Sequence, residues 1–286
     1  TSRSCQSLFS WRQFMEEITC INLDETIEQY TKQLGYRLDM IFPADAPREA
    51  LLSNDGVVVR LVVENHPAAE AAPLLRKEGT WIRGRAGMEY RALSPRFSGQ
   101  PPKGGTPSSG TASAFAAHHI RLTKGGEVPD YVHYHKVDFQ MIYCVKGRIK
   151  VVYEDQGEPF WLETGDCVLQ PPEIRHRVLY ADAGAEVIEV SMPAEHETWV
   201  EHKITLPTST LNPMREFSGQ RFVRHIAAEN IDQNGRDLGI SAATGGRCKA
   251  FVQKITTEDD LPANDGESGL FFRLNDSEIL AVKLNM

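Results

Sequence analysis

Two histidines separated by one residue are the side chains of this 286-residue chain with the clearest potential for chemistry. His133 and His135 lie in "PDYVHYHKVDFQMIYCVKG", which covers residues 129–147. Side chains at positions i and i+2 of a strand project on the same face, so both imidazoles reach one point while Tyr134 points away. Gln140 follows in the next β-rich run and offers a neutral oxygen ligand. The spacing predicts a metal site, with solvated strand histidines as the alternative.

A third histidine follows a rigid turn further along the chain. The stretch "GDCVLQPPEIRH" covers residues 165–176 and brings His176 five residues after Pro171. Three imidazoles and one amide oxygen suit iron, manganese, nickel, copper or zinc. We therefore expect one first-row divalent metal ion on His133, His135, Gln140 and His176. Because all four ligands are neutral, the bound cation keeps more Lewis acidity than it would beside a carboxylate.

These two stretches resemble the paired motifs of the cupin superfamily. The first motif contains glycine, HxH, a carboxylate and a later glycine, and the second contains glycine, proline and histidine. The matching residues are Gly126, His133, His135, Gly147, Gly165, Pro171 and His176. Gln140 replaces the usual glutamate, and Glu173 and Tyr180 stand where the family often has glycine and asparagine. The resemblance implies a double-stranded β-helix barrel whose relatives include metal-dependent enzymes and metabolite-binding proteins.

Short β-rich runs punctuated by glycine and proline extend from Phe115 to about Met192 and are typical of a sandwich or small barrel. Strand parity predicts that Gln140 looks into this barrel together with Ile142. Gln170 directly precedes the Pro171 turn and is expected to line the same pocket. Glu189 is a candidate general base if it faces inward, and an outward salt bridge is its alternative role. The candidate catalytic residues are therefore Glu189 and Gln170.

The first part of the chain predicts a βαβββ module. A short amphipathic helix is expected from Asp24, as its N-terminal cap, to Gly35, with strands on both sides. This order and the stretch "YTKQLGYRLDMI" resemble one module of the glyoxalase/extradiol-dioxygenase group, the vicinal oxygen chelate fold, over about residues 15–65. Glu64 stands near a ligand position of that group, but no histidine accompanies it. We expect a structural module or a lid that binds no metal of its own.

A second repeat is indicated by internal similarity. Residues 117–129 align with residues 250–262, and "FQMIYCVKGRIKV" aligns with "GLFFRLNDSEILAV". The chain thus resembles a bicupin whose second copy is degenerate, because "ANDGESG" stands where the histidines would be, and incomplete, because the sequence ends before a second motif. The predicted domains are 1–79, 80–200 and 201–286. A half-barrel would expose apolar edges, which favours a homodimer.

Composition excludes several classes of function. The net charge is -8, and the basic residues form no long cluster, so neither nucleic acid nor anionic membrane is an expected partner. The apolar runs are far shorter than the roughly 20 residues that span a bilayer. Five cysteines without a CxxC pair, together with an amino end unlike a secretory signal, favour a reducing, cytoplasmic location.

The function expected from these observations is that of a metal-dependent cupin enzyme acting on a small oxygenated organic substrate. A dioxygenase or other oxidoreductase is the first interpretation. A lyase or isomerase that uses Lewis-acid catalysis is an alternative, because the neutral ligand set suits that chemistry. A non-catalytic, small-molecule-binding cupin is the second alternative.

Overall fold

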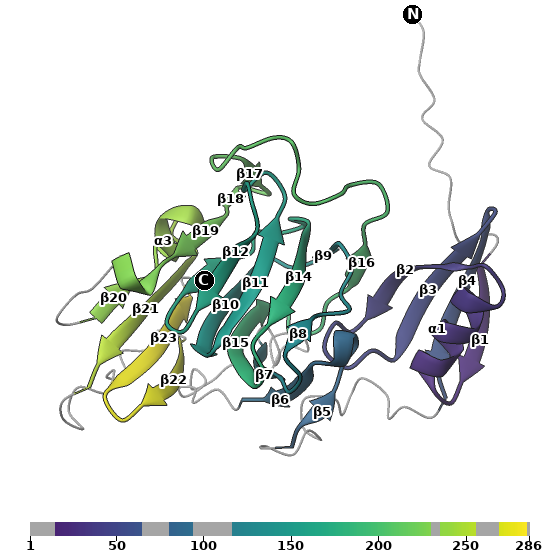
Figure 1. Ribbon diagram of the computed structural model, residues 1–286, viewed down its shortest axis with the longest axis horizontal. Helices are drawn as coiled ribbons and strands as arrows, with labels where there is room; N and C mark the ends of the chain where they lie inside the picture. Colours follow the sequence, from purple (N-terminus) through teal and green to yellow (C-terminus); the bar gives the residue numbers. More distant parts are fainter. Residues whose placement is uncertain (1–14, 65–79, 94–115, 230–234, 256–268, 285–286) are drawn as a thin grey trace, which may run out of the picture.

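The computed structural model describes residues 15–64, 80–93, 116–229, 235–255 and 269–284. The fold is mainly β, as expected. An N-terminal module lies at one end of the molecule, a two-sheet barrel lies in the middle, and a smaller C-terminal sheet lies at the other end (Figure 1). In the part of the chain that is described, no helix has the length and apolar character needed to cross a membrane.

The N-terminal module has the predicted βαβββ order. Its elements are β1 (Met15–Cys20), α1 (Leu23–Lys32), β2 (Arg37–Phe42), β3 (Glu49–Asn54) and β4 (Val57–Val63). The sheet order is β1-β4-β3-β2, and α1 packs on the sheet through a core that includes Leu23, Leu52 and Leu61. The similarity of this module to the glyoxalase group stays a prediction.

The start of helix α1 differs from the prediction. Asn22, not Asp24, is the N-terminal cap, and its side chain accepts a hydrogen bond of 3.3 Å from the backbone N–H of Glu25. Asn and Asp cap helices about equally well, so the residue types alone did not distinguish the two positions. Asp24 instead lies in the first helical turn, where its negative charge suits the positive end of the helix dipole.

Two facing sheets form the barrel. The first has the order β16-β9-β14-β11-β12, with β8 beside β14, and the second has the order β19-β13-β10-β15-β7-β6-β5, in which β19 is Val223–His225. The elements are β5 (Ile82–Arg83), β6 (Glu89–Ala92), β7 (Ala116–Leu122), β8 (Gly126–Glu127), β9 (His133–His135), β10 (Phe139–Lys146), β11 (Arg148–Tyr153), β12 (Phe160–Glu163), β13 (Cys167–Leu169), β14 (His176–Ala181), β15 (Ala185–Met192) and β16 (Thr198–Val200).

Strand β10 illustrates the alternation of side chains that builds this part of the protein. Ile142 and Cys144 belong to the core between the two barrel sheets. Met141 and Tyr143 belong to a second core on the outer side of the same strand. Strand β10 is therefore covered on both faces, which explains why it reads as a nearly continuous apolar run.

The C-terminal part supplies the cover over this outer face. Its elements are β17 (Glu216–Phe217), β18 (Gln220–Arg221), β19 (Val223–His225), β20 (Gly235–Asp237), α3 (Ile240–Ala243), β21 (Cys248–Lys254), β22 (Gly269–Asn275) and β23 (Glu278–Leu284). Strands β20-β21-β23-β22 form an antiparallel sheet whose apolar residues share one core with Met141 and Tyr143.

The interpretation of this sheet as a second cupin repeat stays a prediction. Strand β22 pairs directly with β23, whereas their expected counterparts β10 and β11 belong to different sheets. The segment "ANDGESG", residues 263–269, is expected to replace the second set of histidines, and all of it except Gly269 lies outside the described residues. The homodimer and the three domain boundaries also stay predictions.

The N-terminal module and the barrel share one continuous sheet. Strand β16 pairs with β2 on one side and with β9 on the other, and Thr198 stands opposite both Ile41 and His135. Nearby, Arg48 holds Glu195 in a two-pronged ion pair with distances of 3.0 and 2.7 Å. The module therefore attaches directly beside the strand that carries the HxH pair.

Candidate metal centre

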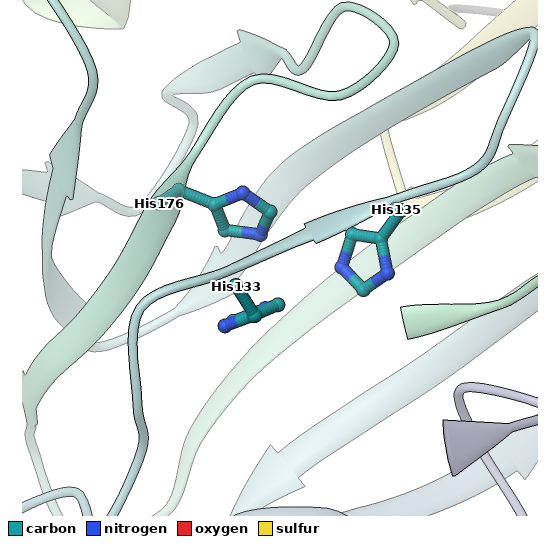
Figure 2. A group of neighbouring side chains, drawn as sticks. All are labelled: His133, His135 and His176. Carbon is teal, nitrogen blue, oxygen red and sulfur yellow. The ribbon is translucent and has the colours of Figure 1, made fainter. Parts of the chain in front are cut away.

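The three predicted histidines meet inside the barrel. His133 and His135 come from β9 and His176 comes from the first position of β14, with the three rings gathered around one space (Figure 2). One ring nitrogen of each histidine lies within 4.8 Å of those of the other two. All three residues are buried. Tyr134 points the other way, where Arg175 stacks over its ring, so the expected strand parity is confirmed.

The Nδ1 atom of each imidazole is held by an oxygen atom. His133 Nδ1 lies 2.8 Å from the backbone oxygen of Tyr131, and His176 Nδ1 lies 3.0 Å from that of Ile174. His135 Nδ1 lies 2.9 Å from the hydroxyl of Thr198. A carbonyl oxygen only accepts, so Nδ1 of the first two rings carries the proton. Their Nε2 atoms then carry the lone pairs, which is the arrangement found around metal-bound histidines.

Two of the Nε2 atoms also contact donors. Arg85 Nη2 lies 3.0 Å from His133 Nε2, and Gln170 Nε2 lies 3.2 Å from His176 Nε2. An N–H donor and a metal ion need the same lone pair. Metal binding therefore requires these two contacts to give way, while the contacts of the three Nδ1 atoms stay.

Burial sets the protonation of the cluster. It lowers the pKa of His176 to about 4. Burial, with the charge of Arg85 next in size, lowers the pKa of His133 well below its ordinary value. Burial also lowers the pKa of His135 well below its ordinary value, with the neighbouring histidines adding to the effect. The imidazoles are neutral near pH 7, which is the form that binds metal.

Arg85 is a site residue that the sequence analysis missed. Its Nη1 donates a 2.6 Å hydrogen bond to Asp130, whose side chain is fully buried. Burial alone would raise the pKa of Asp130, but the charge of Arg85 holds it below its ordinary value. The turn that carries Arg85 depends on Gly84, because a Cβ there would lie 2.5 Å from both the Asp45 carbonyl oxygen and the Tyr90 ring. Only glycine allows this close approach.

A chain of amide and carboxylate groups crosses the wall beside the histidines. Gln140 Nε2 donates to Glu189 at 2.8 Å, and Gln140 Oε1 accepts from Gln170 at 3.0 Å. Gln170 Oε1 in turn accepts from the Tyr153 hydroxyl at 2.8 Å. Glu189 thus lines the interior, as the general-base hypothesis requires. The roles of Gln140 as a metal ligand and of Glu189 and Gln170 as catalytic residues stay predictions.

These groups line one end of a cavity of about 50 Å³ inside the barrel. Its polar part includes Arg85, His135, Gln140, Gln170, His176 and Glu189. Its apolar lining includes Ile120, Leu122, Ile142, Val151, Leu162 and Val187. Three buried, neutral imidazoles, two of them with the tautomer fixed by a backbone carbonyl, fit a first-row metal ion beside a small cavity.

Comparisons with solved structures return several proteins of low sequence identity. An RmlC-like cupin from Shewanella frigidimarina NCIMB 400 is 24% identical over 40% of this chain and 84% of its own, with a TM-score of 0.30. KdgF from Halomonas sp. is 20% identical over 41% of this chain and 87% of its own, with a TM-score of 0.29. A variant of B. subtilis oxalate decarboxylase is 14% identical over 59% of this chain and 54% of its own, with a TM-score of 0.36.

No curated protein sequence matches the chain. A family model described as "Cupin domain" does match, over residues 118–191. This range contains strands β9 and β14 with the three clustered histidines. Residues 118–191 therefore form a cupin domain.

Proposed function

We propose that this protein is a metal-dependent enzyme that acts on a small oxygenated organic molecule. The observation that carries the proposal is the cluster of three buried imidazoles, of which those of His135 and His176 line an internal cavity. His133, His135 and His176 would hold the ion, and Gln140 is the candidate fourth ligand. When bound, the ion supplies a Lewis acid or a redox centre.

The surrounding side chains support catalysis rather than binding alone. Glu189 is a carboxylate on the cavity wall, and its Oε1 atom accepts a hydrogen bond from Gln140. Glu189 is placed to accept or return a proton of a bound substrate. The apolar wall limits the water around the substrate and strengthens the electrostatic interactions inside the cavity.

Two kinds of reaction use these features differently. The dioxygenase or other oxidoreductase expected from the sequence needs the metal site and the apolar cavity. A lyase or isomerase is the second candidate, because Glu189 supports the proton transfer that such a reaction requires. A requirement for oxygen separates the two. The cytoplasmic location and the homodimer remain proposals from the sequence.

The first prediction is that each chain binds about one first-row metal ion, measured by elemental analysis after dialysis without chelator. His133→Ala and His176→Ala should each lose most of the metal, because each removes one of three ligands. Metal should also raise the melting temperature of the unsubstituted protein, since it binds only the folded state. His202→Ala is the control, because that ring contacts the Leu38 carbonyl and Asp39 outside the site. Unchanged metal in both ligand variants would refute the assignment.

The second prediction concerns the pH dependence of metal binding. Three imidazoles with an ordinary pKa of about 6.5 would each weaken metal binding about 10-fold between pH 7.5 and 5.5. Here burial lowers the pKa of all three, to about 4 for His176, so the three rings stay neutral at both pH values. The apparent metal Kd, measured by competition with an indicator, should rise less than about 10-fold in total. A rise of about 1000-fold would show that these imidazoles titrate normally.

The third prediction tests the contact between Gln140 and Glu189. Gln140→Glu replaces an N–H donor by a second carboxylate 2.8 Å from the first. In chelator-treated protein this change should cost about 1–3 kcal/mol of the free energy of unfolding, measured in urea at pH 8. The control is the exchanged pair Gln140→Glu with Glu189→Gln, which restores one donor and one acceptor and should recover most of the loss. If Gln140→Glu alone leaves the free energy of unfolding unchanged, the hydrogen bond between Gln140 and Glu189 does not stabilise the fold.

A further inference from the structure

A second, smaller pocket adjoins the cavity where the N-terminal module meets the barrel. Its volume is about 10 Å³, and its polar lining includes Asp45 from the segment between β2 and β3 together with His118, Glu189 and His196 of the barrel part. Arg85, Tyr90, His135 and Glu189 line both spaces. A molecule held at the three-histidine cluster therefore has this pocket beside it.

His196 presents an unused lone pair there. The residue is 5% exposed, and its ring centroid lies 5.2 Å from that of His135. Its Nδ1 lies 3.3 Å from the backbone oxygen of Pro193, so Nδ1 carries the proton and Nε2 is an acceptor. Among the described residues, the buried Nε2 atom has no hydrogen-bond partner. A buried acceptor without a donor is costly, so it marks a place where a donor is expected.

The other groups around the pocket are also rich in acceptors. Asp45 presents a carboxylate, of which Oδ2 lies 3.1 Å from His118 Nε2. Glu189 accepts a hydrogen bond from Gln140 through its Oε1 atom. Two carboxylates and a neutral imidazole nitrogen match a ligand group that donates a hydrogen bond, such as a hydroxyl. A volume of about 10 Å³ holds one group of that size.

Arg85, in contrast, is a hydrogen-bond donor that needs an acceptor once a metal ion is bound. Its Nη2 donates to His133 Nε2, which is the lone pair that a metal ion needs. Once the metal takes that lone pair, a buried guanidinium N–H beside the cluster requires a new acceptor. A carboxylate of the ligand provides one, because guanidinium and carboxylate groups form strong charge-assisted hydrogen bonds.

We infer that the ligand of this site is a small hydroxy acid, with its carboxylate near Arg85 and its hydroxyl in the pocket beside His196. The N-terminal module is then part of the binding site through Asp45. The inference rests on the proposed metal-dependent function. The cavity of about 50 Å³ restricts the rest of the ligand to a short, mostly apolar chain.

The test uses the full chain loaded with Co(II), and titration calorimetry measures the binding of each ligand whether or not that ligand contacts the metal. Glycolate is compared with propionate, and 3-hydroxypropionate with butyrate, because each pair exchanges a hydroxyl for a methyl group of similar size. At least one hydroxy acid should bind about 10-fold more tightly than its partner, the value of one well-placed buried hydrogen bond. Equal binding within both pairs would mean that the pocket holds only a water molecule, and would overturn the inference.

Variants separate the pocket from simple chelation of the metal. His196→Leu removes the acceptor and should abolish most of the hydroxyl preference, whereas His196→Gln keeps an acceptor oxygen and should retain part of it. Preference that survives in His196→Leu would come from chelation and would contradict the role of His196. Failure of Co(II) to bind at one per chain would instead refute the proposed function.

A second pair of variants tests the contribution of the N-terminal module. Asp45→Asn replaces one acceptor oxygen by a donor and should reduce the hydroxyl preference severalfold. Asp55→Asn is the matched control, because Asp55 lies in the exposed turn between β3 and β4 of the same module. Equal preference in the two variants would show that the module takes no part in the site.

Discussion

The hydrogen bonds to the Nδ1 atoms of three histidines are the constraint on which the site depends. The backbone oxygens of Tyr131 and Ile174 fix two of the rings, and the Thr198 hydroxyl holds the third. Without these contacts an imidazole could turn or exchange tautomers, and the three lone pairs would not converge. Burial then keeps the rings neutral, so orientation and charge both prepare the cluster for a cation.

The N-terminal module stabilises the strand that carries Thr198, the residue whose hydroxyl holds His135. Thr198 lies on β16, and this short strand is bordered by β2 of the module and by β9 of the barrel. A three-residue strand at a free edge would be easily displaced. Pairing with β2 covers that edge, while the ion pair of Arg48 with Glu195 fixes the segment just before it. Through backbone pairing, the module therefore supports the strand whose Thr198 hydroxyl holds His135.

Local patterns in the sequence predicted the core of the site well. The period of two along a strand placed His133 and His135 on one face, and the motif spacing added His176 from the adjacent strand. The βαβββ order followed from hydrophobic periodicity and turn residues in the same way. Each of these features depends on neighbours in sequence or on a known spacing between motifs.

Features that depend on contacts between distant segments could not be predicted. Arg85 reaches His133 across 48 positions from a turn that has no motif of its own. Asp45 and His196 enter the site only because β2 pairs with β16, a register that neither strand specifies alone. The replacement of glutamate by Gln140 was visible in the sequence, but its reason was not. The amide donates to Glu189 on the neighbouring strand, where a second carboxylate would be repelled.

The central claim is that His133, His135 and His176 hold one metal ion through their Nε2 atoms. The most direct measurement is X-ray diffraction from metal-loaded crystals on both sides of the metal absorption edge. One anomalous peak per chain is expected among the three Nε2 atoms, with the Nδ1 contacts retained and Arg85 no longer donating to His133. A peak at any other place in the chain, or coordination through Nδ1, would contradict it.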